Sequence, residues 1–391
     1  MIAATRQAPW RTSEAFVPAA RPRGRKELRV LMTVDAVGGV WRYGIDLARA
    51  MRPLGARFLL AGFGPRPSAG QIAEAGELCE VEWTGLELDW TAHDRGDLKP
   101  VAPRIDAIAA DFGAHLIHLN LPSQAGGLSG ALPVVVVSHS CLPSWWRTMR
   151  DGSLPADWQW HLEANREGFD RADVVVAPSR THADLIQNCH GRIERLTVVH
   201  NATALAGERT EKEPFVLATG RWWDEGKNGC VLSEAAKSIA WPVVMAGPTR
   251  GPTGQTLALG NVQAPGSLAH AEVRSLMRRA AIVVSPSRYE PFGLSALEGA
   301  RAGAALVLSD IPTYRELWTD AAIFFDPNDP AALAAAMGRL IDDGELRLAT
   351  AARARERSRR FAPEAQARAM MEIYERALAR RAAPLAQEAS R

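Results

Sequence analysis

Two cationic side chains lie six residues apart where an apolar run gives way to a polar loop. Arg221 closes the sequence Thr-Gly-Arg, and Lys227 follows after Trp-Trp-Asp-Glu-Gly. Arginine and lysine side chains bind phosphate oxygens, and a glycine such as Gly220 lets the backbone approach an anion closely. The spacing therefore predicts a clamp for a diphosphate, and the alternative interpretation is two solvated surface charges.

Two carboxylates, Glu290 and Glu298, flank the start of a predicted helix. Glu290 directly precedes a proline, which disfavours helical backbone at that position, so we expect it to end a loop. Glu298 falls inside the helix. Carboxylates at these places can accept hydrogen bonds from sugar hydroxyls, while the amides of Gly293 and Leu294 can bind phosphate oxygens. The alternative is an ordinary helix start with an acidic residue near its positive end.

Histidine and asparagine side chains end two of the apolar runs in the first half of the chain. His139 follows the run from Val134 to Ser138, and His118 and Asn120 lie in His-Leu-Asn-Leu-Pro at the end of the preceding run. Ligands of parallel sheets bind outside the carboxyl ends of the strands, which makes these side chains candidate ligand contacts. Residues that merely cap a strand are the alternative.

A glycine pair and a group of tryptophans also suit ligand binding. Gly38 and Gly39 follow an apolar run and precede a helical pattern, so they either let a ligand approach the backbone or simply form a tight turn. Trp145 and Trp146 begin a tryptophan-rich segment. Aromatic faces stack on sugars and apolar chains, so we interpret this segment as a ligand pocket or, equally, as a helix-packing cluster.

Short runs of valine, isoleucine and leucine position these residues. The first half contains such runs at 30–34, 58–61, 116–118, 134–137 and 174–177, and the second half at 215–219, 243–246, 281–284 and 305–308. Helical patterns or loops separate most of them. Near-continuous apolar strands alternating with helices are typical of a parallel sheet covered on both faces. Two such series predict an α/β protein with two Rossmann-like, doubly wound domains facing a central cleft.

The 391 residues divide into four predicted parts. These are a flexible, basic N-terminal tail over 1–26, an N-terminal Rossmann-like domain over 27–206, a C-terminal Rossmann-like domain over 207–362, and a helix over 363–391. The last part carries apolar residues on one helical face, so we expect it to pack back on the N-terminal domain.

Composition excludes several classes of protein. Lysine and arginine number 46 against 44 aspartate and glutamate, and the resulting formal charge of +2 predicts no nucleic-acid partner. The four cysteines are far apart and predict neither a metal site nor a disulfide framework. No apolar run reaches the about 20 residues that span a bilayer. The arginine-rich stretch over 353–360 predicts a solvated helix face, with docking on a membrane surface as the alternative.

The two motifs of the second half occur together. Glu290 and Glu298 enclose the sequence Glu-Pro-Phe-Gly-Leu-Ser-Ala-Leu-Glu, and Gly220-Arg221 and Lys227 stand upstream of it. This combination closely resembles retaining glycosyltransferases of family 4, over about residues 27 to 380. The resemblance implies the two-domain GT-B fold, a UDP- or GDP-linked sugar as donor, retention at the anomeric carbon, and no metal or other cofactor.

The resemblance also implies that the domain over 27–206 lies on the acceptor side and that the domain over 207–362 binds the nucleotide sugar. It further implies roles for individual residues. Arg221 and Lys227 match the diphosphate-binding pair, Glu290 the carboxylate beside the transferred sugar, Glu298 the ribose contact, and His139 a contact to the donor sugar. The implied catalytic residues are His139, Glu290, Arg221 and Lys227. The implied donor-binding residues are Gly38, Gly39, Gly220, Arg221, Lys227, Glu290, Phe292, Gly293, Leu294 and Glu298, and the acceptor candidates are His118, Asn120, Trp145 and Trp146.

The predicted function is retaining transfer of a hexosyl group to a hydroxyl of a glycan, lipid or small molecule. Envelope glycan, exopolysaccharide or glycolipid synthesis is the expected context, at a cytoplasmic location, with peripheral membrane contact left open. One alternative is a non-catalytic nucleotide-sugar-binding or scaffold protein on the same fold. Another is a GT-B sugar-nucleotide epimerase, for which we find no acid and base residues in the sequence.

Overall fold

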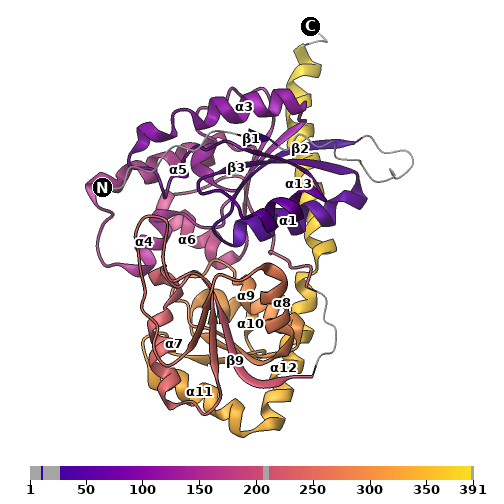
Figure 1. Cartoon of the computed structure of the whole chain (residues 1–391). Helices are drawn as coiled ribbons and strands as arrows, with labels where there is room; N and C mark the ends of the chain where they lie inside the picture. The colour runs from indigo at the N-terminus through magenta and orange to yellow at the C-terminus, as the bar shows by residue number, and fades with distance from the viewer. Residues whose placement is uncertain (1–9, 12–26, 206–210, 389–391) are drawn as a thin grey trace. The chain divides into compact units, whose positions relative to one another are not determined.

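The computed structural model describes residues 10–11, 27–205 and 211–388, which fall into two compact units (Figure 1). Unit 1 contains the residues up to Pro178, His182–His200 and those from Pro363 onward. Unit 2 contains Ser179–Thr181 and Asn201–Ala362, so it begins ahead of the division predicted at residue 207. Apart from residues 10–11, the predicted N-terminal tail over 1–26 lies outside the described residues.

Unit 1 is built on one sheet whose seven longer strands are parallel. In spatial order the strands are β1 (Trp10–Arg11), β4 (Glu80–Trp83), β3 (Ala56–Phe63), β2 (Leu28–Asp35), β5 (Leu116–Leu119), β6 (Val134–Val137), β7 (Val174–Ala177) and β8 (Leu196–Val198). The two-residue strand β1 pairs antiparallel with β4 at the edge. All the apolar runs predicted as strands in this half form strands. The sequence analysis missed β4, because its Glu-Val-Glu-Trp sequence is not a continuous apolar run.

Helices cover both faces of the unit 1 sheet. They are α1 (Gly39–Met51), α2 (Ala69–Gly76), α3 (Val101–Phe112), α4 (Leu142–Met149), α5 (Gln159–Arg171), α6 (Arg180–His190) and α13 (Pro363–Glu388), with short 3-10 turns at Arg52–Leu54, Arg95–Leu98, Pro122–Gln124 and Ala156–Trp158. One buried cluster joins alternate residues of β2 to α1 and α13, and a second joins the opposite residues to α3 and α5 (Figure 1). The period-two alternation of a strand therefore divides the core into two layers.

Unit 2 contains a parallel sheet of six strands. In spatial order they are β11 (Gln263–Gly266), β10 (Val243–Ala246), β9 (Glu213–Thr219), β12 (Ala280–Ser285), β13 (Ala305–Ser309) and β14 (Ile323–Phe325). The four central strands are the four predicted from apolar runs. The exposed strand β11 and the short strand β14 were not predicted, since neither is a long apolar run.

Helices also cover both faces of the unit 2 sheet. They are α7 (Gly229–Ala235), α8 (His270–Arg279), α9 (Leu294–Ala302), α10 (Pro312–Trp318), α11 (Pro330–Asp342) and α12 (Gly344–Ser358), with 3-10 turns at Glu225–Lys227, Ala236–Ser238 and Arg359–Phe361. Residues of α8, α9 and α10 pack on one face and residues of α7 and α11 on the other. Both units therefore have the doubly wound architecture expected from the sequence.

The helix α13 belongs to unit 1 although it ends the chain. Its apolar side chains Met370, Ile373 and Tyr374 are buried in the same cluster as residues of α1. Near its end Arg381 pairs with Asp173 at 3.3 Å. The amphipathic pattern predicted for this segment thus supplies part of the unit 1 core.

The arginine-rich stretch of α12 is partly structural. Arg353 donates to the carbonyl of Asp320 at 2.8 Å, and Arg357 donates to that of Thr319 at the same distance. Both carbonyls lie just beyond the end of α10, where a helix leaves acceptors unpaired. Arg353 is nevertheless exposed, as the predicted solvated face requires, whereas Arg357 is partly buried. Among the described residues no helix is long and apolar enough to cross a membrane.

Candidate functional site

The centre of the unit 2 sheet is a topological switch point. The chain leaves β9 toward β10 on one side, and it leaves β12 toward β13 on the other, while β9 and β12 are themselves paired. The loops that follow two such strands diverge, and ligands of doubly wound sheets bind in the crevice this creates. Arg221 and Lys227 follow β9, whereas Glu290 and Gly293 follow β12, so the two sequence motifs meet at this point.

Lys227 and Glu290 form a close ion pair at the switch point. The lysine Nζ lies 2.6 Å from Glu290 Oε2, and the side chains are 20% and 15% exposed. Arg221 is oriented separately, because its guanidinium lies 3.3 Å from Asp224 Oδ2 and 5.6 Å from the centre of the Trp223 ring. The site therefore contains two cations and a carboxylate that are positioned before any ligand binds.

Hydrogen bonds fix the loops that carry this ion pair. Asn228, which directly follows Lys227, has a left-handed backbone with φ of 55°. Its side-chain amide donates to the carbonyls of Pro286 at 3.0 Å and Pro327 at 2.7 Å. The backbone N–H of Arg288 donates to the carbonyl of Gly226 at 2.9 Å. The β9 and β12 loops are thus joined, which sets the distance between Lys227 and Glu290.

The helix α9 begins at this site with a glycine in the left-handed region. Gly293 has φ of 93°, and a Cβ built there would lie 2.6 Å from Cε1 of the buried Tyr314 ring. No side chain caps this helix start, and unpaired amides at a helix N-terminus bind anions well. Leu294 forms the first turn, and Glu298 lies in the second turn, partly buried. Gly293 is required here both for its backbone conformation and for the absence of a side chain.

Phe292 can offer a ligand its backbone but not its ring. The side chain is 2% exposed and packs edge-on against Phe361, with ring centres 5.5 Å apart. A neighbouring residue, Ser179, donates from its hydroxyl to the Pro291 carbonyl at 2.7 Å. Glu316 in turn accepts from the backbone N–H of Thr181 at 2.7 Å. The core and residues 179–181 therefore hold the loop that presents Glu290.

A glycine that the sequence analysis overlooked supports Gly220. A Cβ on Gly220 would find only ordinary contacts with the Trp222 ring, at 3.5 Å. Gly247, after β10, has φ of 129°, and a Cβ there would lie 1.9 Å from the Gly220 carbonyl oxygen. The close approach of these two backbones thus requires glycine at 247. The sequence Ala-Gly-Pro after an apolar run was the available signal.

Unit 1 has its own switch point, between β2 and β5. Gly38 and Gly39 follow β2, and neither has a positive φ. What they would offer a ligand is the absence of a side chain rather than an unusual backbone. Asp35 Oδ1 accepts from the N–H of Val37 at 2.9 Å and orders this turn.

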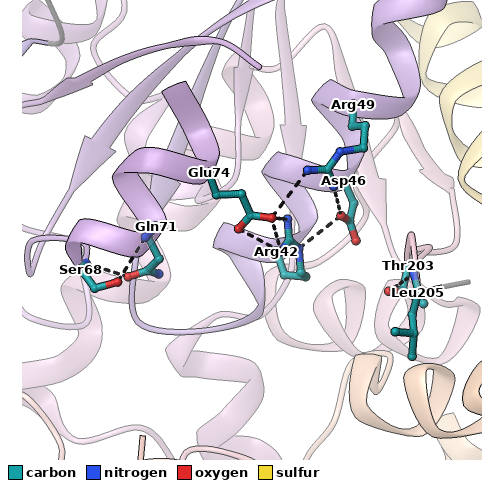
Figure 2. Close-up of polar contacts among 8 residues, drawn as sticks. All are labelled: Arg42, Asp46, Arg49, Ser68, Gln71, Glu74, Thr203 and Leu205. Carbon is teal, nitrogen blue, oxygen red and sulfur yellow. Dashed lines mark hydrogen bonds and ion pairs between the residues drawn. The ribbon is translucent and has the colours of Figure 1, made fainter. Parts of the chain in front are cut away.

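An ion-pair network holds the helix that starts at Gly39. Arg42 of α1 lies 2.9 Å from Glu74 of α2 and 3.2 Å from the buried Asp46, and Arg49 lies 3.4 Å from Asp46 (Figure 2). The side chain of Arg42 is only 11% exposed. Figure 2 also shows the capping pair of α2, in which Ser68 and Gln71 exchange hydrogen bonds. These contacts stabilise the packing of α1 against α2, and α1 starts at the turn that contains Gly38 and Gly39.

His118, Asn120 and His139 come together at the carboxyl ends of β5 and β6. Asn120 Oδ1 lies 3.1 Å from His118 Nε2 and 2.9 Å from His139 Nε2. His118 Nδ1 lies 2.6 Å from the hydroxyl of Tyr374 in α13. Burial lowers the pKa of His118 to about 4, and desolvation together with the nearby His118 also lowers the pKa of His139. Both rings are therefore neutral near pH 7.

The tryptophan segment forms a packed cluster. Trp146 meets Trp158 edge-on with ring centres 5.4 Å apart, and Arg150 lies 5.0 Å from the Trp145 ring centre. Trp160 stacks on His161 at 3.6 Å. Trp145 and Trp146 remain partly exposed, so packing and contact with a ligand are both compatible with this geometry.

Comparison with known proteins identifies the family. Residues 37–206 match the sequence profile of Glycosyltransferase Family 4, and residues 206–357 match that of Glycosyl transferases group 1. The chain belongs to glycosyltransferase family 4. It is thus a glycosyltransferase, as its motifs predicted, and the GT-B fold expected from them is confirmed.

Individual relatives place this glycosyltransferase among diverse members of the family. It is 28% identical to the D-inositol 3-phosphate glycosyltransferase of Xylanimonas cellulosilytica, over 90% of this chain and 94% of that protein. It is 43% identical to the glycogen synthase of Mycobacterium tuberculosis over 94 residues, which span 24% of this chain and only 23% of that protein. The structure of Anabaena Alr3699/HepE in complex with UDP-glucose superposes with a TM-score of 0.71 at 19% identity, covering 89% of this chain and all of that one.

The predicted residues are divided between the two units. One group lies at the unit 2 switch point and comprises Gly220, Arg221, Lys227, Glu290, Phe292, Gly293, Leu294 and Glu298. The other lies in unit 1 and comprises Gly38, Gly39, His118, Asn120, His139, Trp145 and Trp146. Asn228, Gly247 and Tyr374 are the structurally important additions. The contact of Tyr374 with His118 spans 256 residues of sequence, so no local pattern could have revealed it.

Proposed function

We propose that this glycosyltransferase moves a hexosyl group from a UDP- or GDP-linked sugar to a hydroxyl, with retention at the anomeric carbon. The observation that carries the proposal is the arrangement of Arg221, Lys227 and Glu290 around the start of α9. It combines two cations with the amide end of a helix, which suits a diphosphate, and a carboxylate, which suits sugar hydroxyls.

The charges that develop during the reaction explain why the site contains two cations and a carboxylate. Breaking the anomeric C–O bond leaves negative charge on the departing nucleoside diphosphate and positive charge on the sugar ring. Arg221, Lys227 and the amides near Gly293 would stabilise the diphosphate, so we propose that no metal ion is needed. Glu290, at 2.6 Å from Lys227, would orient the sugar rather than act as the nucleophile.

Without a covalent glycosyl–enzyme intermediate, retention requires the acceptor to arrive on the face that the diphosphate leaves. The acceptor oxygen forms its bond to the anomeric carbon as the bond to the diphosphate breaks. The hydroxyl proton passes to an oxygen of the departing β-phosphate, so that no protein base is consumed. His139, a neutral ring at the end of β6, would contact the donor sugar.

For the acceptor we propose a hydroxyl of an envelope glycan, an exopolysaccharide or a glycolipid. The partly exposed rings of Trp145 and Trp146 support this class, because aromatic faces stack on sugars and apolar chains. The Xylanimonas relative is named for D-inositol 3-phosphate, a phosphorylated polyol, so we also propose to test this compound as an acceptor.

A transfer assay tests the proposal. Purified enzyme would be incubated with UDP- and GDP-linked hexoses and a panel of these acceptors, and the anomeric configuration of any product would be determined by proton NMR. Transfer with the donor's own configuration supports the proposal, and an inverted product refutes retention. Nucleotide binding without transfer or donor hydrolysis would favour the scaffold alternative, and a changed donor sugar would favour the epimerase.

A further inference from the structure

Asn120 lies between the two histidines at the ligand end of the unit 1 sheet. Its Oδ1 is 3.1 Å from Nε2 of His118 and 2.9 Å from Nε2 of His139. Asn120 is 4% exposed and His118 is fully buried. Since buried polar atoms need partners, the arrangement of protons within this group is physically constrained.

The orientation of the Asn120 amide follows from its other contact. The side-chain nitrogen lies 2.7 Å from the backbone carbonyl of Thr33, a group that can only accept a hydrogen bond. The backbone N–H of Asn120 donates to the Thr33 hydroxyl at 3.0 Å, and that hydroxyl donates to Gln124 at 2.7 Å. The NH2 of Asn120 therefore faces Thr33, and its oxygen faces the histidines.

This orientation determines the tautomer of both rings. An amide oxygen is an acceptor with two lone pairs, so each histidine must donate to it from a protonated Nε2. His118 Nδ1 is then a bare acceptor, and it lies 2.6 Å from the Tyr374 hydroxyl, which donates to it. Burial keeps His118 and Tyr374 uncharged near pH 7, since it lowers the pKa of the former and raises that of the latter.

The same reasoning leaves one acceptor on His139. With a proton on Nε2, the lone pair of the neutral ring is on Nδ1. No described residue forms a hydrogen bond with this nitrogen, and the residue remains partly exposed. The ring of Tyr43 meets that of His139 edge-on at 4.4 Å and restricts its rotation. His139 is thus held by its hydrogen bond to Asn120 and by its contact with the Tyr43 ring.

We propose that Asn120 is a positioning residue that holds His139 in the Nε2–H tautomer, so that Nδ1 is presented as a hydrogen-bond acceptor to a substrate hydroxyl. Tyr374 donates to His118 Nδ1, so the proton of His118 is on Nε2, which donates to Asn120 Oδ1. This series of hydrogen bonds links α13 to the ligand end of β6. The inference rests on the proposed function for the identity of the substrate, but the tautomer itself is a property of the free protein.

The tautomer is measurable directly. Long-range proton–nitrogen NMR spectra of protein labelled with 15N-histidine distinguish protonated from bare ring nitrogens, with His139→Gln and His118→Gln used for assignment. Wild-type protein at pH 7 should show Nε2–H and bare Nδ1 for both residues. Nδ1–H at His139 in the wild-type protein would overturn the proposal, whether or not any variant folds.

Kinetics test the consequence for catalysis. Asn120→Ala should give a mixture of His139 tautomers and reduce kcat by at least about tenfold, because the wrong tautomer presents a donor where an acceptor is needed. Asn165→Ala is the matched control, since Asn165 is equally buried in unit 1 but bonds to the His161 carbonyl at 2.8 Å.

The control should retain the wild-type His139 spectrum and a kcat within about twofold of wild type. An equal loss of kcat in both variants, with the Nε2–H tautomer unchanged in Asn120→Ala, would refute the positioning role. A wild-type protein with this tautomer but without transfer activity would refute the proposed function and leave the tautomer assignment standing.

Discussion

Gly293→Ala tests whether the start of α9 is built for a ligand. Gly293 and Gly303 bound the same helix, and both have left-handed backbones, with φ of 93° and 82°. A Cβ at 303 would meet only Lys212 Cε, at 3.8 Å, whereas a Cβ at 293 would lie 2.6 Å from the Tyr314 ring. Tyr314 is fully buried and its hydroxyl bonds to Ser285, so the ring has no room to move. Gly303→Ala is therefore a matched control.

The expected magnitudes follow from these contacts. A left-handed backbone costs a residue with a Cβ about 1–2 kcal/mol, and both variants incur this cost. Overpacking a filled core adds about 1–3 kcal/mol, and only Gly293→Ala incurs this second term. The free energy of unfolding should therefore fall by about 2–5 kcal/mol in Gly293→Ala and by about 1–2 kcal/mol in Gly303→Ala.

Urea unfolding and calorimetric nucleotide titration measure the two effects. The clash displaces the first turn of α9, so Gly293→Ala should weaken nucleoside diphosphate binding by at least about tenfold, which corresponds to about 1.4 kcal/mol. Gly303→Ala should bind the nucleotide like the wild-type enzyme. Equal destabilisation of the two variants with unchanged affinity in both would show that this argument about Gly293 is mistaken.

Three further substitutions have defined outcomes. Lys212→Met removes an amine that donates at 2.8 Å to the carbonyls of Arg278 and Ala302, near the ends of two helices, and should destabilise the enzyme by about 1.5–3 kcal/mol in urea unfolding without changing nucleotide affinity. Burial raises the pKa of Asp89 from 3.8 to about 6, so the wild-type free energy of unfolding should contain a term that falls by about 3 kcal/mol as pH rises from about 3 to about 7, and Asp89→Asn should remove that fall. Asn228→Ala removes the hydrogen bonds to the Pro286 and Pro327 carbonyls and should lower both the free energy of unfolding and the nucleotide affinity. A variant with normal affinity would contradict the conclusion that these bonds set the distance between the loops after β9 and β12.

The sequence predicted the central elements because their signals are local. Apolar runs such as 134–137 and 215–219 are bounded by polar or glycine-containing loops, and both form buried strands. The motif residues could be placed at strand ends and at the start of α9 because a parallel sheet puts its ligand site there. The strands β4 and β11 lack a continuous apolar run, and the apolar strand β14 is only three residues long, so the pairing of these strands depends on neighbours that no local pattern reveals.

The contacts within the sites depend on the tertiary fold. The 2.6 Å ion pair of Lys227 with Glu290 joins loops 63 residues apart, and the requirement for glycine at 247 arises from the carbonyl of Gly220. The sequence analysis included His118 and Asn120 only as acceptor contacts. The hydrogen bond of His118 to Tyr374 depends on the packing of α13 in unit 1, so no local pattern predicts it.

Calorimetric titration of the wild-type enzyme with UDP, GDP, ADP and TDP tests the central claim most directly, with Arg221→Ala and Lys227→Ala measured alongside. Each charge-assisted contact to a phosphate is worth about 1.5–3 kcal/mol, so one nucleotide should bind and each variant should bind it about 10–150-fold more weakly. The exposed Lys237 lies elsewhere in unit 2 and pairs with Glu234, so Lys237→Ala should bind like the wild-type enzyme. Binding that is equally strong in all four proteins would contradict the assignment of the diphosphate to the ends of β9 and β12.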